Sequence, residues 1–87
     1  MRKLTAVMIV RNEEHVLPGC LDSLAGVADT LVVVDTGSAD GTLTLLKNEA
    51  DRDRFEHVKI KQHPFDGFGS SRRRALEMAD TAWILWI

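Results

Sequence analysis

Three continuous apolar runs constrain the fold of this chain more than any other feature. Residues 4–10, 31–34 and 83–87 consist almost entirely of apolar side chains and are long enough to form strands. A strand with one wet face alternates apolar and polar residues, whereas a parallel sheet covered on both faces needs unbroken apolar strands. Residues 57–61 instead alternate apolar with basic or polar side chains, which is typical of an edge strand. The sequence therefore predicts a parallel sheet with residues 57–61 at its edge.

The segment after the first run has the spacing of a helix. Its apolar residues recur every three or four positions: Val16, Leu17, Cys20, Leu21 and Leu24. Asn12 is a candidate N-cap for this helix, because its side chain can accept a hydrogen bond from a free backbone N–H group. Pro18 removes one backbone donor, so we expect either a kink or a later start of the helix.

Two further helical patterns complete an alternation of strands and helices. One begins at residues 40–42, and the other would be capped by Ser70 or Ser71. Their inward residues would be Leu43, Leu46 and Ala50 in the first and Ala75, Leu76 and Ala79 in the second. Strands and helices in alternation, joined by right-handed crossovers, give an α/β fold. We expect a Rossmann-like parallel sheet with helices on both faces.

Length and charge limit the classes of function. A chain of 87 residues holds one domain at most, and its net charge of −2 argues against a nucleic-acid-binding protein. No stretch approaches the roughly 20 apolar residues of a transmembrane segment. Cys20 is the only cysteine, so an internal disulfide is impossible. These features predict a cytoplasmic protein, with peripheral membrane association of a longer parent left open.

Ligands of open α/β sheets bind outside the carboxyl ends of the strands, where the strand order reverses. This rule selects residues 10–13, residues 35–38 and whatever follows Ile87. The Asp35 carboxylate could accept hydrogen bonds from a ligand, or it could make a local turn with Gly37 or Ser38. Both interpretations remain open on the sequence alone.

Three consecutive arginines stand in or near the first turn of the last predicted helix. Positive charges there oppose the helix dipole, and an anion such as a diphosphate would offset that cost. The alternative is that Arg72, Arg73 and Arg74 are solvated. The three histidines lack metal-ligand spacing, and neither a G-x-G-x-x-G fingerprint nor a P-loop occurs.

The tetrapeptide at residues 35–38 spells the D-T-G-S of aspartic proteases. Short proteases of this kind form dimers in which each chain supplies one catalytic aspartate. Their fold is almost entirely β, however, and here a helical pattern follows the tetrapeptide. The order of elements therefore argues against a protease, which we keep as a remote alternative.

Ordered matches along the whole chain resemble family 2 glycosyltransferases. Residues 8–14 and 20–24 are similar to the opening of this family, and residues 33–42 resemble its V-V-D-[DTS]-G-S-x-D-x-T turn. Residues 66–72 with Ala75 and Leu76 are similar to its D-G-F-[GA]-x-x-R-N-x-A-L stretch, in a variant that points to the subgroup of lipooligosaccharide β-1,4-glucosyltransferases. Residues 83–87 resemble the strand that leads into its D-A-D-E motif.

The resemblance implies the N-terminal nucleotide-binding half of a GT-A fold and a nucleotide-sugar donor, usually a UDP-sugar. The residues that it implies near the base and ribose are Val10, Arg11, Asn12 and Glu13. Asp35, Thr36 and Gly37 would help hold the nucleoside, and Arg72 would lie near the diphosphate. Two departures matter: many members have a second acid where this chain has Thr36, and the usual asparagine is Arg73 here.

The resemblance also implies that residues 1–87 are a partial domain, truncated before the Asp-x-Asp motif. The ligands of a divalent metal, Mn²⁺ or Mg²⁺, and the catalytic base would follow Ile87, so we assign no catalytic residue and no metal ligand here. We expect this piece to be inactive alone and to self-associate through residues 83–87. The parent would act on a glycan or lipid-linked acceptor. A non-catalytic nucleotide-binding or interaction module is the alternative function.

Overall fold

Strands and helices alternate along the chain in the computed structural model, which describes residues 3–64, 67–79 and 83–86. The strands are β1 (Leu4–Val10), β2 (Thr30–Asp35), β3 (His57–Gln62) and β4 (Trp83–Trp86). The helices are α1 (Leu17–Leu24), α2 (Thr42–Asp51) and α3 (Phe68–Met78). All strand pairs are parallel, and the order across the sheet is β3-β2-β1-β4. The α/β prediction is confirmed.

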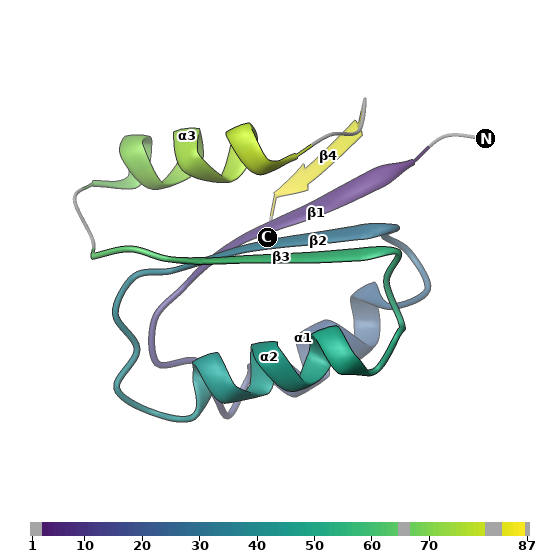
Figure 1. Cartoon of the computed structure of the whole chain (residues 1–87), viewed down its shortest axis with the longest axis horizontal. Helices are drawn as coiled ribbons and strands as arrows, with labels where there is room; N and C mark the ends of the chain where they lie inside the picture. The colour runs from purple at the N-terminus through teal and green to yellow at the C-terminus, as the bar shows by residue number, and fades with distance from the viewer. Residues whose placement is uncertain (1–2, 65–66, 80–82, 87) are drawn as a thin grey trace.

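Helices cover both faces of the sheet, as predicted. In Figure 1, α1 and α2 lie together on one face and α3 lies on the other. Side chains that alternate along β1 and β2 enter two separate cores. The first core faces α1 and α2 and includes Met8, Leu31 and Leu46, whereas the second faces α3 and includes Val32 and Ala75. Because the central strands are buried on both sides, their sequences are continuously apolar.

The strand order reverses at β1. The first two crossovers move from β1 to β2 and on to β3, and the third returns to place β4 on the other side of β1. In the described residues, β3 lies at one edge of the sheet, which confirms the prediction for residues 57–61. Strand β4 lies at the other edge, and Ile87, the last residue of the predicted strand, is outside the described residues. The topological switch point is therefore between β1 and β4.

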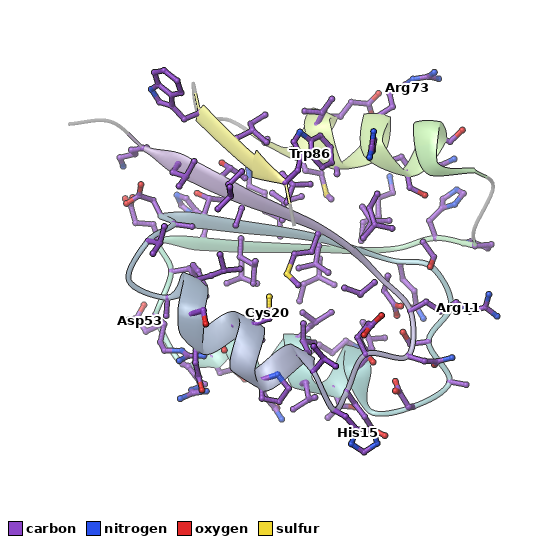
Figure 2. The ribbon with its side chains drawn as sticks, turned by 180° about the vertical axis from the view of Figure 1, so that it is seen from behind. Arg11, His15, Cys20, Asp53, Arg73 and Trp86 are labelled. Atoms are coloured by element: carbon purple, nitrogen blue, oxygen red, sulfur yellow. The ribbon has the colours of Figure 1, made fainter. Side chains whose placement is uncertain are left out.

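Helix α1 starts later than its apolar pattern suggests. Its first residue is Leu17, and Pro18 lies in the first turn, where the missing N–H group costs no hydrogen bond. Of the two effects predicted for Pro18, the late start is the one observed. The prediction of Asn12 as N-cap is wrong, and Val16 is 65% exposed rather than inward. Figure 2 shows Cys20 on α1 directed toward the sheet.

Helix α3 starts earlier than predicted. Its N-cap is Gly67, whose φ of 116° is accessible to glycine but strained for other residues. Ser70 and Ser71 therefore lie inside the helix and do not cap it, and the arginine block begins at its fifth residue, beyond the first turn. Ala75 is buried as predicted, but Leu76 is 44% exposed. The dipole argument for an anion at these arginines is correspondingly weakened.

Candidate functional site

Strands β1, β2 and β3 end side by side at the carboxyl edge of the sheet. The parallel register pairs Val10 with Asp35 and Asp35 with Gln62, which are the last residues of β1, β2 and β3. The segments that follow these residues consequently leave the sheet side by side. One cluster at the carboxyl edge is formed by the loop at residues 11–16, the loop at residues 36–41, and His63 and Pro64.

Hydrogen bonds join the first two loops directly. The Thr36 backbone N–H and hydroxyl both donate to the Val10 carbonyl, at 2.9 and 3.0 Å. The Asn12 N–H donates to Ser38 Oγ at 2.9 Å, and the Ala39 N–H donates to Asn12 Oδ1 at 2.7 Å. The Asn12 side chain thus binds the neighbouring loop instead of capping α1, and its φ of 52° turns the chain into that position.

Two more hydrogen bonds join the same two loops where the second loop leads into α2. The Glu13 N–H donates to Thr42 Oγ1 at 2.8 Å, and the Gly41 N–H donates to Glu14 Oε2 at 3.0 Å. Hydrogen bonds from the Thr42 hydroxyl and from backbone N–H groups hold the pKa of Asp40 below its ordinary value, although burial acts in the opposite direction. The loops after β1 and β2 therefore behave as one hydrogen-bonded unit.

Asp35 is completely buried at the end of β2. Its Oδ1 accepts hydrogen bonds from the Ser38 N–H at 3.1 Å and the Ser38 hydroxyl at 2.6 Å, which is the local turn anticipated as one of two interpretations. Its other oxygen, Oδ2, is buried and has no hydrogen-bond partner in the part of the chain that the structure describes. A buried carboxylate oxygen without a donor costs free energy. Asp35 is not among the residues that line the cavity described below.

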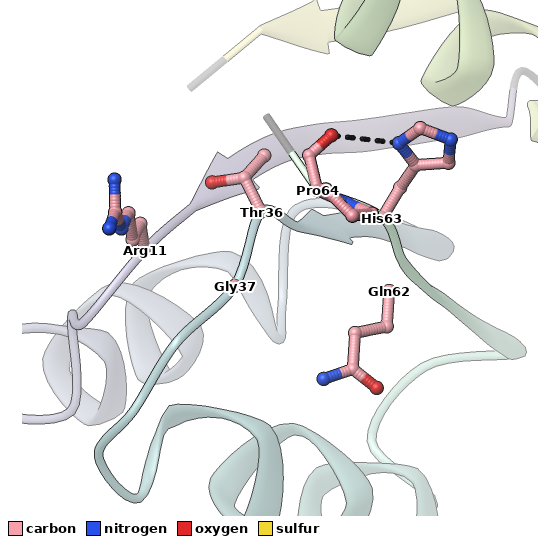
Figure 3. Close-up of a pocket in the computed structure, with 6 residues that line it drawn as sticks. All are labelled: Arg11, Thr36, Gly37, Gln62, His63 and Pro64. Atoms are coloured by element: carbon pink, nitrogen blue, oxygen red, sulfur yellow. Dashed lines mark hydrogen bonds between the residues drawn. The ribbon is translucent and has the colours of Figure 1, made fainter. Parts of the chain in front are cut away.

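A cavity of about 610 Å³ opens between these loops and the end of β3 (Figure 3). Its lining residues are Arg11, Thr36, Gly37, Gln62, His63 and Pro64. Gly37 has a φ of 108°, a conformation that strains any residue with a side chain. Arg11 supplies a positive charge, and Thr36 and Gln62 supply polar groups. The cavity therefore combines one cation with neutral hydrogen-bonding groups, which suits an anionic polar ligand.

The hydrogen bond between His63 and Pro64 fixes which ring nitrogen of His63 donates. His63 Nδ1 lies 2.8 Å from the Pro64 carbonyl oxygen. Because a carbonyl can only accept, Nδ1 must carry the proton, and Nε2 of the neutral ring is then an acceptor.

Comparison with known proteins assigns the family. Residues 5–87 match the protein family described as Glycosyl transferase family 2. The chain belongs to this family.

Three relatives are similar to nearly the whole chain: two are named glycosyltransferases and one is named for its TPR repeats. The lipopolysaccharide core biosynthesis glycosyltransferase LpsC of Rhizobium meliloti is 34% identical over 80 residues, covering 92% of this chain and 28% of the relative. A TPR repeat-containing protein of Synechococcus elongatus is 36% identical over 85 residues, 98% of this chain and 20% of the relative. The prophage-derived glycosyltransferase SunS of Bacillus subtilis is 29% identical over 85 residues, 97% of this chain and 19% of the relative. The chain thus spans less than a third of these relatives.

Three residues implied by the family resemblance line the cavity: Arg11, Thr36 and Gly37. Asp35 lies buried beside them, and Val10 is buried in the core that faces α1 and α2. The roles of Asn12 and Glu13 in the structure are contacts between the loops. Their contact with a ligand remains a prediction, as do the ligand contacts of the other five residues.

Arg72 does not line the cavity. It projects from the second turn of α3, and its guanidinium carbon lies 5.6 Å from the centroid of the Trp86 ring. Its proximity to a diphosphate therefore stays a prediction. Among the described residues, no group of three or more His, Cys, Asp or Glu side chains is placed to hold a metal ion.

Sequence reasoning missed the contribution of β3 to the cavity. Gln62, His63 and Pro64 follow the carboxyl end of a parallel strand, so the rule that selected the loops after β1 and β2 selects them too. The alternating pattern of residues 57–61 indicates only that this strand lies at an edge.

The D-T-G-S protease alternative is wrong, because these residues join a parallel β2 to α2. No helix in the described ranges is long and apolar enough to cross a membrane.

Proposed function

We propose that the protein containing this chain transfers a sugar from a nucleotide-sugar donor to a glycan or lipid-linked acceptor, and that the cavity described above holds the nucleotide. One observation carries the proposal: the ends of β1, β2 and β3 lie level and surround a single cavity with a cationic rim. Membership of glycosyl transferase family 2 makes a sugar donor the expected ligand of that cavity.

The residues of the cavity have complementary chemistry for a nucleoside diphosphate. Arg11 can contact a phosphate or ribose oxygen through charge-assisted hydrogen bonds. Asp35 stays a predicted contact of the nucleoside from the family resemblance, but its carboxylate is buried and the residue does not line the cavity. The hydroxyl of Thr36 already donates to Val10, so toward a ligand this side chain offers an acceptor. Gly37 lets the ligand approach the backbone.

The chemical step needs more than these residues. A divalent cation bound by carboxylates would neutralise the leaving diphosphate as a Lewis acid. The described residues do not form such a carboxylate cluster, so we assign this chain to donor binding and derive no step through a metal. We propose that the metal ligands and the general base belong to other parts of the protein.

Titration calorimetry of the 87-residue chain with UDP and with uridine tests the proposal. Both ligands should bind, and Arg11→Ala should weaken UDP about fivefold, because one exposed charge contact contributes about 1 kcal/mol. Arg52→Ala is the matched control, since Arg52 is an exposed arginine at the carboxyl end of α2, outside the cavity. Absence of binding by the wild-type chain, or equal losses in both variants, would contradict the proposal.

A further inference from the structure

The cavity changes in charge between its β1 side and its β3 side. Arg11, directly after β1, is a cation, whereas the end of β3 contributes Gln62 and Pro64, which are uncharged. The sheet order β3-β2-β1 separates the two sides by two strand spacings, about 10 Å. In Figure 3, Arg11 and Gln62 lie on opposite sides of Gly37. A ligand that fills the cavity therefore meets a positive group at one end and neutral groups at the other.

The pleat of β3 fixes the direction of the Gln62 side chain. Val58 and Ile60 pack against the core that faces α1 and α2, and alternate residues of a strand share a face, so Gln62 points to the same side of the sheet. His63 follows it, and Figure 3 shows the two side chains pointing in opposite directions. Gln62 is exposed, so its amide can meet a ligand in the cavity.

The hydrogen-bonding capacity of the Gln62 amide differs from that of the other polar side chains in the cavity. The Thr36 hydroxyl already donates to a backbone carbonyl, which leaves an acceptor. His63 Nδ1–H also donates to a backbone carbonyl, which leaves Nε2 as an acceptor. Arg11 can only donate. Among the lining residues that the structure describes, Gln62 alone therefore offers a neutral N–H donor beside an acceptor.

Of the parts of a nucleotide, the nucleobase has the chemistry that matches this amide. The edge of uracil presents the N3–H donor beside the O4 acceptor in the plane of the ring, so one planar side-chain amide can pair with both at once. Phosphate oxygens only accept and carry negative charge, which suits the guanidinium of Arg11. The base therefore fits the β3 side of the cavity, and the phosphates fit the β1 side.

We infer that Gln62 is the residue that binds the nucleobase edge, and that the nucleotide lies across the strand ends with its base at β3 and its phosphates toward Arg11. This inference rests on the proposed function, because it concerns the orientation of the nucleotide in the same cavity. It assigns the base contact to a side chain of β3, where Thr36 has already used its hydroxyl proton within the chain.

The test compares the affinities of the 87-residue chain for uridine and for 3-methyluridine, in which a methyl group replaces the N3 hydrogen. The wild-type chain should bind uridine about two- to tenfold more tightly, the range expected from one hydrogen bond. Gln62→Ala should weaken uridine by a similar factor and remove the preference for uridine over 3-methyluridine. Asn48→Ala is the matched control, since Asn48 is an exposed amide on α2 outside the cavity, and it should change neither affinity.

Titrations with UDP test the orientation of the nucleotide. Gln62→Ala should weaken UDP and uridine by the same factor, because the two ligands share the base. Arg11→Ala should weaken UDP more than uridine, because only UDP carries phosphates. The reverse pattern, or an equal loss of both ligands in Arg11→Ala, would overturn the inferred orientation.

The outcomes separate the two proposals. Failure of the wild-type chain to bind both UDP and uridine contradicts the proposed function itself. Equal binding of uridine and 3-methyluridine by the wild-type chain overturns this inference and leaves the nucleotide cavity standing. A preference for uridine that persists in Gln62→Ala does the same, because another group would then bind N3–H.

Discussion

Replacing Gly41 with alanine tests the junction that holds the two main loops of the site together. A Cβ atom at residue 41 would lie 2.5 Å from Glu14 Oε2, closer than real Cβ contacts come. The same oxygen accepts the hydrogen bond of the Gly41 N–H group at 3.0 Å. Glu14 has a flexible side chain, so its carboxylate would move away and the hydrogen bond between the loops would be lost.

The expected loss in the free energy of unfolding is modest but measurable. A hydrogen bond to a charged group contributes about 1.5–3 kcal/mol, and partial exposure reduces this to about 1 kcal/mol here. Gly41 is also the N-cap of α2, where alanine is less favourable than glycine by several tenths of a kcal/mol. The total of about 1–1.5 kcal/mol corresponds to a fall in Tm of several degrees for a chain of this size.

Urea unfolding followed by circular dichroism gives the free energies, with Gly19→Ala as the matched control. No atom outside the neighbours of Gly19 and its own helix lies within 4 Å of a Cβ there, so alanine should stabilise α1 by about 0.5 kcal/mol. In a Glu14→Ala background, Gly41→Ala should cost only the N-cap term. Equal destabilisation in both backgrounds would refute the role assigned to Glu14, as would destabilisation of the same size by Gly19→Ala.

Three more predictions concern the core, pH and the exposed strand. Leu46→Ala should lower the free energy of unfolding by about 2–5 kcal/mol because Leu46 is fully buried, whereas Leu76→Ala should change it by less than about 0.5 kcal/mol. The Asp40 carboxylate accepts two hydrogen bonds from Thr42, which lower its pKa in the folded chain. Its contribution to the free energy of unfolding should therefore be complete above the ordinary pKa of 3.8 and be lost as pH falls below that value. The free energy of unfolding of Asp40→Asn should depend less on pH between pH 4 and pH 2. The edge strand β4 exposes 52% of Trp83, so the chain should self-associate in sedimentation experiments and Trp83→Lys should reduce this; a wild-type chain that stays monomeric at high concentration would contradict the prediction.

Strand positions were predictable because burial on both faces leaves a direct trace in the sequence. The run at residues 4–10 corresponds to β1 residue for residue. Helix starts were less predictable, because contacts distant in sequence determined them. Asn12 has the chemistry of an N-cap, but its side chain binds Ala39, 27 residues away, and no local pattern reveals that. At α3 the sequence does contain a local signal, because Gly67 is the N-cap and has a positive φ, but Ser70 and Ser71 are the more usual capping residue type.

The location of the site could be predicted from the sequence, but several of its contacts could not. The carboxyl ends of the strands indicated the loops that contain Arg11 and Thr36, and the structure joins them through the Val10 carbonyl. The contact between Arg72 and Trp86 was not predictable, because it depends on how α3 lies across the sheet. The partial burial of Cys20 agrees with the apolar spacing of α1.

The most direct test of the nucleotide cavity is the change in amide NMR shifts of the ¹⁵N-labelled chain on titration with UDP. The account predicts that the largest shifts occur at Arg11, Thr36, Gly37, Gln62 and His63, which surround the cavity at the ends of three strands. Shifts concentrated instead at the opposite edge of the sheet, around Asp29 and Glu56, or an unchanged spectrum at millimolar UDP, would contradict it.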